Sequence, residues 1–411
     1  MSWKLVIILF AVLTALYSLL IHYLRLRSAK MPIPANVSDV YDRAEFKRWN
    51  EYNTEKVRLS ILSEIAMLLV TCVLLALDAH AAFASLFGSN LYLQTFAVLL
   101  FQSLVMLVFG WGFEYYDTMK IEEKYGFNRT TMKTFIRDQF VNLIIGLVFN
   151  MALSALLCAV HQWLGDSMVI LFAVLLTLIA FFLAFISPAI SRIENKFTPL
   201  EEGELRDKLT ALLQKNGYHV RQIEVMDASR RTTNTNAYFT GMGKTKTIVL
   251  YDNMLNLMTA DEIVAVFAHE LGHGLHKDVT KMQLMNMGNM LFMALFAWLL
   301  VRTGAVHTAF GFDMVNYGFA FLLLNNVLMQ LLAPVLQPLL YSYSRFAEYR
   351  ADRQAVSEGY GPALVTALKK LTKDNFSILA PHPLLVTLCY SHPPMSQRIA
   401  AIEKEAAKLN K

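Results

Sequence analysis

The chain has 411 residues, of which 55% are apolar and 17% charged, and its mean hydropathy is +0.41. Soluble globular chains usually carry about 25% charged residues, so this composition excludes a disordered protein, a coiled coil and an ordinary soluble enzyme. The net charge is only +5. The three cysteines, Cys72, Cys158 and Cys389, lie far apart and form neither a disulfide framework nor a thiolate metal site. The composition predicts a membrane protein.

Seven apolar stretches are long enough to cross a bilayer, which needs about 20 residues. They are residues 5–23, 61–83, 91–113, 140–162, 168–187, 284–301 and 318–340. Several contain polar residues, among them Glu64, Asp78 and Gln102, which favour hydrogen bonds between helices and, less often, a polar cavity. The first stretch is longer than a signal peptide core and no cleavage site follows it. We therefore expect a retained span.

The basic residues predict the orientation. With the N-terminus outside, the inner segments are 24–60, 114–139, 188–283 and 341–411, and they hold 35 of the 37 Lys and Arg residues. Only Lys4 and Arg302 then lie outside. Because basic residues gather on the cytoplasmic side of membrane proteins, this distribution explains the positive charge as a topology signal, and no nucleic acid partner is expected.

Within 188–283 the pattern predicts a mixed helix and strand segment. Pro199 is expected to open a helix that Gly217 ends. Two or three strands are expected, at about residues 221–227, 235–240 and 246–251, the last two as a hairpin across Gly241-Met242-Gly243. A second helix begins at Thr259, which forms a capping box with Glu262, and runs to residue 278.

This second helix contains His269-Glu270-Leu271-Gly272-His273. Residues four apart share a helix face, so both imidazoles can bind one metal ion, and Glu270 can project toward a water molecule on that metal. Zn²⁺ bound by neutral imidazoles lowers the pKa of its water to about 7, and the carboxylate accepts the proton. The pattern predicts a zinc hydrolase with one zinc ion per chain.

A catalytic zinc ion usually takes three protein ligands, and the spacing leaves the third open. Glu348 and Asp352 are four residues apart on a polar helix at 341–357. One carboxylate could bind the metal while the other orients a ligating imidazole. The alternative is a solvated face that pairs with Arg345 or Arg350.

Two further histidines lie near these motifs. His276 follows His273 by three residues and could reach the metal only with distortion, so a place at the solvated helix C-terminus is favoured. His392 lies in the loop Ser391-His392-Pro393-Pro394, from which it could hydrogen-bond a developing oxyanion.

The chain resembles the type I CAAX prenyl proteases, a family of seven-span zinc metalloendopeptidases. The resemblance rests on EEKYGFNRTT (122–131), NKFTPLEEGELRDKL (195–209), NTNAYFTGMGKTKTIVLYDNML (234–255), VFAHELGHGLHKD (266–278), EYRAD (348–352) and SHPPMSQRI (391–399). It implies an all-α polytopic membrane protein whose seven helices enclose a water-filled chamber, with an intracellular α+β zinc metallopeptidase domain.

The resemblance also implies roles for single residues. By this resemblance, Glu348 is the third zinc ligand after His269 and His273. Asp352 is the carboxylate that orients a ligating imidazole. His392 matches a histidine of the family that lies near the reacting carbonyl. Asn236 matches a position in the edge strand that binds the substrate backbone.

The expected organisation follows from these assignments. Residues 1–187 contain transmembrane helices one to five with cytoplasmic loops at 24–60 and 114–139. Residues 188–283 and 341–411 form the metallopeptidase segments, and 284–340 contain helices six and seven. The two polar segments together have about 165 residues, a normal domain size.

We expect a membrane-embedded endopeptidase that acts on peptide or protein substrates, including prenylated ones, in contact with membrane lipid. The compact chain favours a bacterial inner membrane, or the endoplasmic reticulum membrane in a eukaryote, with the catalytic side cytoplasmic. A general quality-control protease with the same site and a membrane chaperone with structural zinc are the alternatives. An intramembrane site-2-type protease is disfavoured, because the charged residues around the His-Glu motif place it near or outside the membrane surface.

Overall fold

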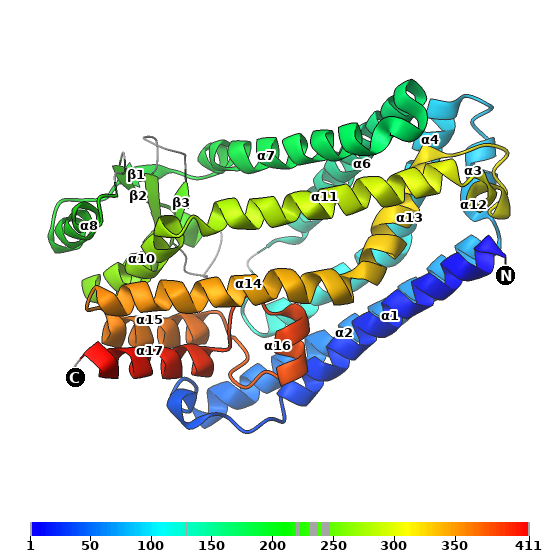
Figure 1. Ribbon diagram of the computed structural model, residues 1–411. Coiled ribbons are helices and arrows are strands. Elements are labelled where there is room, and N and C mark those ends of the chain that lie inside the picture. The colour runs from blue at the N-terminus through cyan, green and yellow to red at the C-terminus, as the bar shows by residue number, and fades with distance from the viewer. Residues whose placement is uncertain are drawn as a thin grey trace. The chain divides into compact units, whose positions relative to one another are not determined.

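The structure is a computed structural model, and it describes residues 2–128, 130–218, 220, 222–230, 237–240 and 247–409. Helices dominate these residues, and one small sheet interrupts them (Figure 1). The chain divides into two compact units. The helical unit comprises Met1–Leu26, Asn50–Thr177 and Asn286–Leu336, and the sheet unit comprises Arg27–Trp49, Leu178–Met285 and Gln337–Lys411.

The long apolar helices account for the spans predicted from the sequence. They are α1 (Trp3–Ser28), α2 (Arg43–Ala76), α4 (Leu91–Val105), α5 (Trp111–Tyr116), α6 (Met132–Leu164), α7 (Met168–Glu194), α11 (Asp278–Arg302), α13 (Tyr317–Leu323) and α14 (Met329–Ser357). Three π-helical turns lie within these runs, η2 (Met106–Gly110), η3 (Asp117–Glu122) and η7 (Leu324–Leu328). Two short helices, α3 (Ala79–Ser85) and α12 (Gly304–Ala309), connect them.

Six continuous helical stretches are long and apolar enough to cross a membrane among the described residues. One of them, Met132–Leu183, has 52 residues, which at 1.5 Å per residue is more than twice the length that a bilayer needs. It consists of α6 and α7, which meet at a 3₁₀ turn that begins at Gly165 with φ 53°. With α6 and α7 counted as separate spans, the six stretches supply the helices for seven spans.

The second predicted span, 61–83, is wrong at its C-terminal end. Helix α2 ends at Ala76, and Asp78 adopts a left-handed conformation with φ 55° before α3. The hydrophobic run continues through this break, so composition alone did not reveal it.

The surfaces of these helices require an apolar solvent. In α2 only 6% of the most apolar window is buried, and Leu62, Ile65, Leu69 and Val73 form an exposed stripe at helical spacing. A stripe of this kind is unfavourable in water but stable against lipid acyl chains. The chain is thus an integral, multi-pass membrane protein.

The sheet unit contains four strands in the order β1-β2-β4-β3. They are β1 (Phe197–Pro199), β2 (Gln222–Met226), β3 (Ala237–Thr240) and β4 (Thr247–Tyr251). Strand β2 runs parallel to β4, and β1 and β3 are antiparallel edge strands. The central strand β4 is buried from Thr247 to Leu250, as expected for a strand covered on both faces.

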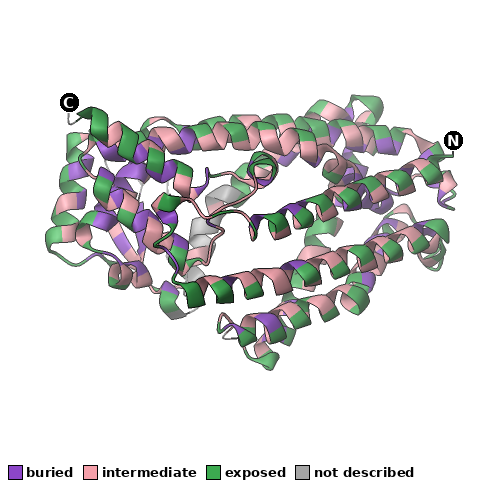
Figure 2. Cartoon of the chain, turned by 90° about the horizontal axis from the view of Figure 1, so that it is seen from below, coloured by how far each residue is buried: buried purple, intermediate pink, exposed green. Residues whose placement is uncertain are grey.

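Helix α10 (Ala260–Leu275) is the central helix of the sheet unit. It packs against β3, α8 (Glu204–Lys215), α9 (Asp252–Leu257) and α15 (Gly361–Asp374). Helices α16 (Pro383–Cys389) and α17 (Met395–Leu409) complete the unit. Figure 2 shows buried residues concentrated among the elements beside the C-terminus. These residues form a core around Phe267, Leu271 and Leu364.

The sequence predictions for residues 188–283 are mostly confirmed. The three predicted strands are β2, β3 and β4, and β3 pairs with β4 as a hairpin would; the turn residues 241–243 lie outside the described residues. The capping box of Thr259 and Glu262 is present. Pro199 does not open a helix, because it ends strand β1, and α8 begins only at Glu204.

Residues 27–49, expected within a cytoplasmic loop, belong to the sheet unit. Val37, Tyr41 and Trp49 are buried against Leu379 and Ile399. The indole of Trp49 donates a hydrogen bond of 2.9 Å to the carbonyl oxygen of Phe376, so this segment is part of the core.

Gly272 allows α10 to approach α14 closely. A Cβ atom at this position would lie 2.9 Å from Cα of Ala351 and 3.0 Å from Cβ of Gln354. The first contact is with backbone, which cannot rotate away.

We therefore predict that Gly272→Ala destabilises the protein by about 1–3 kcal/mol, the usual effect of overpacking. The measurement is thermal unfolding of the purified protein in detergent. Gly288→Ala in α11 is the matched control, because a Cβ there meets no atom within 4 Å and only the gain in helix propensity remains. Equal melting temperatures for the two variants would contradict the packing argument.

Candidate zinc centre

Helix α10 presents two imidazoles from consecutive turns. The rings of His269 and His273 have centroids 4.9 Å apart and are nearly perpendicular. The capping box at Thr259 fixes where α10 begins, and the buried side chains of Phe267 and Leu271 hold its opposite face in the core. The face that carries both histidines is thereby fixed.

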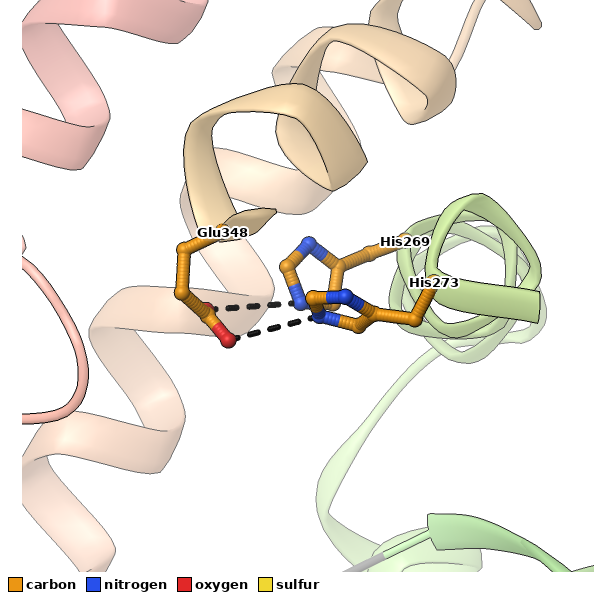
Figure 3. A group of neighbouring side chains, drawn as sticks. All are labelled: His269, His273 and Glu348. Carbon is orange, nitrogen blue, oxygen red and sulfur yellow. Dashed lines mark ion pairs between the residues drawn. The ribbon is translucent and has the colours of Figure 1, made fainter. Parts of the chain in front are cut away.

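Glu348 of α14 faces both imidazoles (Figure 3). Its Oε2 atom lies 3.5 Å from Nε2 of His269, and its Oε1 atom lies 3.3 Å from Nε2 of His273. One ligand atom from each of these three residues lies within 4.8 Å of the others. These three atoms together form a candidate site for one metal ion.

The donors present fit a zinc ion. Two imidazole nitrogens and one carboxylate oxygen form the set that a catalytic zinc site takes from its protein, leaving a position for water or substrate. The Oε2 atom of Glu348 is buried and accepts no hydrogen bond, and it forms an ion pair with Nη1 of Arg398 at 3.1 Å. A bound cation would add a direct ligand contact to this buried oxygen.

Charge balance supports the same conclusion. Around the two imidazoles the structure gathers four carboxylates, of Glu270, Asp278, Glu348 and Asp352, and two guanidinium groups, of Arg350 and Arg398. With neutral imidazoles these groups carry a net charge of minus two. A divalent cation neutralises that charge, which is costly to bury unpaired.

Each histidine also has a carboxylate behind it. The Nδ1 atom of His269 lies 2.9 Å from Oδ1 of Asp352, and Nδ1 of His273 lies 3.0 Å from Oδ2 of Asp278. A carboxylate that accepts the Nδ1 proton leaves the Nε2 lone pair free for a metal. Both Nε2 atoms face Glu348, so the tautomers required for metal binding are the ones that these contacts favour.

Sequence reasoning missed the role of Asp278. It extended the helix to residue 278, which would carry this side chain away from His273. In the structure α10 ends at Leu275, and Lys277 adopts a left-handed conformation with φ 55°. That turn brings Asp278 back to His273. The hydroxyl of Tyr343 donates to Asp278 at 2.8 Å, and Arg350 forms an ion pair with it.

Arg398 of α17 joins the two carboxylates of α14. It donates two hydrogen bonds to Asp352, from Nε at 2.9 Å and from Nη2 at 2.6 Å. Its Nη1 atom lies 3.1 Å from Oε2 of Glu348. Since all three side chains are buried, the guanidinium fixes the carboxylates relative to His269.

The alternative of a solvated carboxylate face is wrong. Glu348 is 5% exposed and Asp352 is 1% exposed. Arg345 donates instead to the backbone carbonyl oxygens of Val386 and Tyr390, and Arg350 pairs with Asp278.

The metal-free pKa of His273 shows how strongly the carboxylates act. Burial alone would lower this pKa, but the contacts with Glu348 and Asp278 outweigh burial and raise it to about 9. Below that pH a metal ion must displace the proton. Zinc affinity is therefore expected to rise with pH up to about 9.

A cavity of about 400 Å³ opens beside the three predicted ligands. Glu270 and His392 line it together with His269 and Glu348. The carboxylate of Glu270 has no hydrogen-bond or ion-pair partner among the described residues. The remaining walls are largely apolar, from Met254, Val266, Leu364, Leu368, Leu371 and Met395.

His392 lies in the loop between α16 and α17 and reaches the same cluster. Its Nε2 atom is 3.3 Å from Oε1 of Glu348, and its Nδ1 atom is 2.9 Å from the hydroxyl of Ser391. The side chain is 64% exposed. The metal-binding group does not include His276, and Asn236 lies outside the described residues.

The chain was compared with known proteins. Residues 199–406 match the description "Peptidase family M48", and residues 22–192 match "CAAX prenyl protease N-terminal, five membrane helices". The CAAX prenyl protease 1 homolog of Oryza sativa subsp. japonica is 29% identical over 93% of both chains. CAAX prenyl protease 1 of Saccharomyces cerevisiae is 29% identical over 99% of this chain and 96% of its own.

A solved structure agrees over nearly the whole chain. The crystal structure of S. mikatae Ste24p superposes with a TM-score of 0.88 at 26% identity, covering 98% of this chain and 99% of that one. Together with the His269, His273 and Glu348 cluster, these matches define a membrane-spanning zinc metalloendopeptidase. The chain belongs to peptidase family M48, in the group of the type I CAAX prenyl proteases. The family and zinc site expected from the sequence are thus confirmed.

The zinc ligand Glu348 and the carboxylates of Asp278 and Asp352, which contact the histidines, should differ in their effect on zinc affinity. Glu348→Ala removes a ligand and is expected to lose most of the bound zinc, since two imidazoles alone rarely hold a catalytic ion. Asp278→Asn and Asp352→Asn keep all three ligands and should each weaken zinc affinity by about 10–100-fold. The measurement is competition for zinc with a chelator.

Asp207→Asn is the matched control, because Asp207 is exposed on α8 of the same unit. It should bind zinc like the unchanged protein. Wild-type affinity in Asp278→Asn would show that Asp278 does not position His273.

Proposed function

We propose that this chain hydrolyses a peptide bond of an extended substrate held in the cavity beside His269, His273 and Glu348. The observation that carries the proposal is the position of Glu270, whose carboxylate lines the same cavity and has no hydrogen-bond or ion-pair partner within the part of the chain that the structure describes. A zinc ion bound there supplies positive charge that polarises a carbonyl oxygen and acidifies a water molecule. A purely structural site has no use for such a carboxylate.

Glu270 acts as the general base and then as the general acid. It takes a proton from the attacking water and delivers it to the amine that leaves when the peptide bond breaks. Its place next to His269 in the chain keeps it near the ligands but on a different side of α10.

His392 stabilises the developing oxyanion. Its Nε2 atom lies at the edge of the ligand carboxylate, where a carbonyl oxygen of the substrate would gain negative charge. The Ser391 hydroxyl fixes the ring orientation through Nδ1. A preorganised donor in this position typically contributes 10²–10³-fold to turnover.

The peptide binds along strand β3. This strand pairs with β4 on one side only among the described strands, so its other edge can accept a further extended chain through backbone hydrogen bonds. Strand β3 packs against α10, which carries the two histidines. Asn236 directly precedes β3, and we assign it to substrate binding.

The apolar cavity walls favour substrates with apolar groups beside the cleaved bond. The relatives are named CAAX prenyl proteases, and this name supports prenylated protein C-termini as the substrate class. Cleavage of farnesylated and unprenylated versions of one peptide tests it: a preference for the farnesylated version is expected. Equal rates would favour a general quality-control protease with the same site.

Glu270→Gln is predicted to separate metal binding from chemistry. The amide preserves the shape and all three ligands, so zinc should remain bound, whereas turnover should fall by at least about 10²–10⁴-fold. Peptide cleavage and zinc content are measured on the same preparation. Substrate binding should persist, so this variant can trap the native substrate.

Glu403→Gln is the matched control, since Glu403 is exposed on α17. It should cleave at the wild-type rate. Near-normal proteolysis by Glu270→Gln would assign the base to another residue, and zinc loss would give Glu270 a structural role.

We propose that the catalytic side is cytoplasmic, because that orientation places 35 of the 37 basic residues inside. The compact chain supports a bacterial inner membrane as its location. A reporter fused after Lys411 is predicted to give a cytoplasmic signal, and fusion after Arg302 an external one. The reverse pair of signals would overturn this orientation.

A further inference from the structure

A cavity of the helical unit has none of the zinc ligands in its lining. It has a volume of about 700 Å³ and lies between α2 and the run from η2 through α5 to η3. Its lining comprises Glu55, Arg58, Leu59, Leu62, Phe109, Gly112, Phe113, Tyr116, Lys120, Ile121 and Lys124. None of these residues has a role in the proposed peptide hydrolysis.

Ion pairs join the two helical runs that line this groove. Lys56 of α2 contacts Asp117 at 3.1 Å and Glu122 at 2.5 Å, and the hydroxyl of Tyr52 donates to Glu122 at 2.7 Å. These contacts hold the two helical runs together where both are polar. Lys124 pairs in the same way with Glu55.

The groove lining also contains two basic side chains that these contacts do not pair. Arg58 and Lys120 are exposed, line the groove, and have no ion-pair partner among the described residues. A groove with unpaired positive charge attracts an anion. Phosphate groups are well suited, since a guanidinium can donate to two phosphate oxygens at once.

The groove changes from polar to apolar along its length. On α2 the lining runs from Arg58 to Leu62, and on the opposite run it passes from Lys120 through Phe113 to Phe109. Leu62 is 59% exposed and Phe109 is 46% exposed, on helices whose apolar surfaces require lipid. A soluble anion has no use for these apolar walls, whereas an acyl chain does.

The backbone of the second wall is also unusual. Two π-helical turns, η2 and η3, flank α5 and Gly112, and such bulges occur frequently at functional sites. A Cβ atom at Gly112 would meet nothing within 4 Å. The absence of a side chain there keeps the wall open.

We propose that this groove binds one anionic phospholipid of the surrounding bilayer. Its phosphate lies against Arg58 and Lys120, and one acyl chain lies along Leu62, Phe113 and Phe109. Basic pockets between membrane helices bind anionic head groups in this manner. The proposal is independent of the peptidase mechanism.

The test is native mass spectrometry of the purified full-length protein, titrated with dioleoylphosphatidylglycerol or with dioleoylphosphatidylcholine in detergent. One phosphatidylglycerol should be retained in preference to phosphatidylcholine. The double variant Arg58→Gln, Lys120→Gln should weaken its retention by about 10–30-fold, as expected for two basic groups near an anionic head group. Gly112→Leu keeps both charges but fills the groove and should also lose the lipid.

The charge-matched control is Lys133→Gln, Arg137→Gln, two exposed positions of α6 outside the groove. This double variant should retain phosphatidylglycerol like the wild type, and all variants should cleave peptide, which shows that they are folded. Equal retention of the two lipids, or equal losses in the groove and control variants, would overturn the proposal. Displacement of the lipid by millimolar inorganic phosphate would show a simple anion site, and displacement by substrate peptide would assign the groove to substrate.

Discussion

The zinc centre depends on the close approach of α10 and α14 at Gly272. A histidine pair on one helix supplies only two ligands, and the third comes from a helix more than seventy residues further along the chain. Because Gly272 has no side chain, the backbone of Ala351 can lie against α10. That contact sets the distance between the Nε2 atoms of His269 and His273 and the carboxylate of Glu348.

The polar groups around this contact form one connected network. Asp352 and Asp278 contact the Nδ1 atoms of the two imidazoles. Arg398 bridges Asp352 and Glu348. Arg350 and Tyr343 bind the carboxylate of Asp278. Buried networks are stable only when each member is satisfied, and a divalent cation satisfies the excess negative charge of this one. Among the described residues the network leaves the Glu270 carboxylate without a hydrogen-bond or ion-pair partner, so it remains available for proton transfer.

Much of this arrangement could be predicted because its signals are local. The His-Glu-x-x-His spacing, the capping box at Thr259 and the pairing of β3 with β4 are each encoded within fifteen residues or fewer. Strand β1, which ends at Pro199, was missed because a proline shortly before a helix does not show whether the helix begins there or later. The helix break at Asp78 was missed because the apolar run continues through it. Asp278 was missed for a similar reason: its role depends on a single left-handed residue, Lys277. The choice between Glu348 and Asp352 is a tertiary property, and only family resemblance indicated it before the structure did.

The central claim is that two imidazoles of α10 and one carboxylate of α14 bind the catalytic zinc. X-ray absorption spectroscopy at the zinc edge of the purified protein tests it most directly. Two imidazole nitrogens at about 2.0–2.1 Å, oxygen ligands at about 2.0–2.2 Å and no sulfur are expected. A sulfur shell at about 2.3 Å, or a third imidazole in the place of the carboxylate, would contradict it.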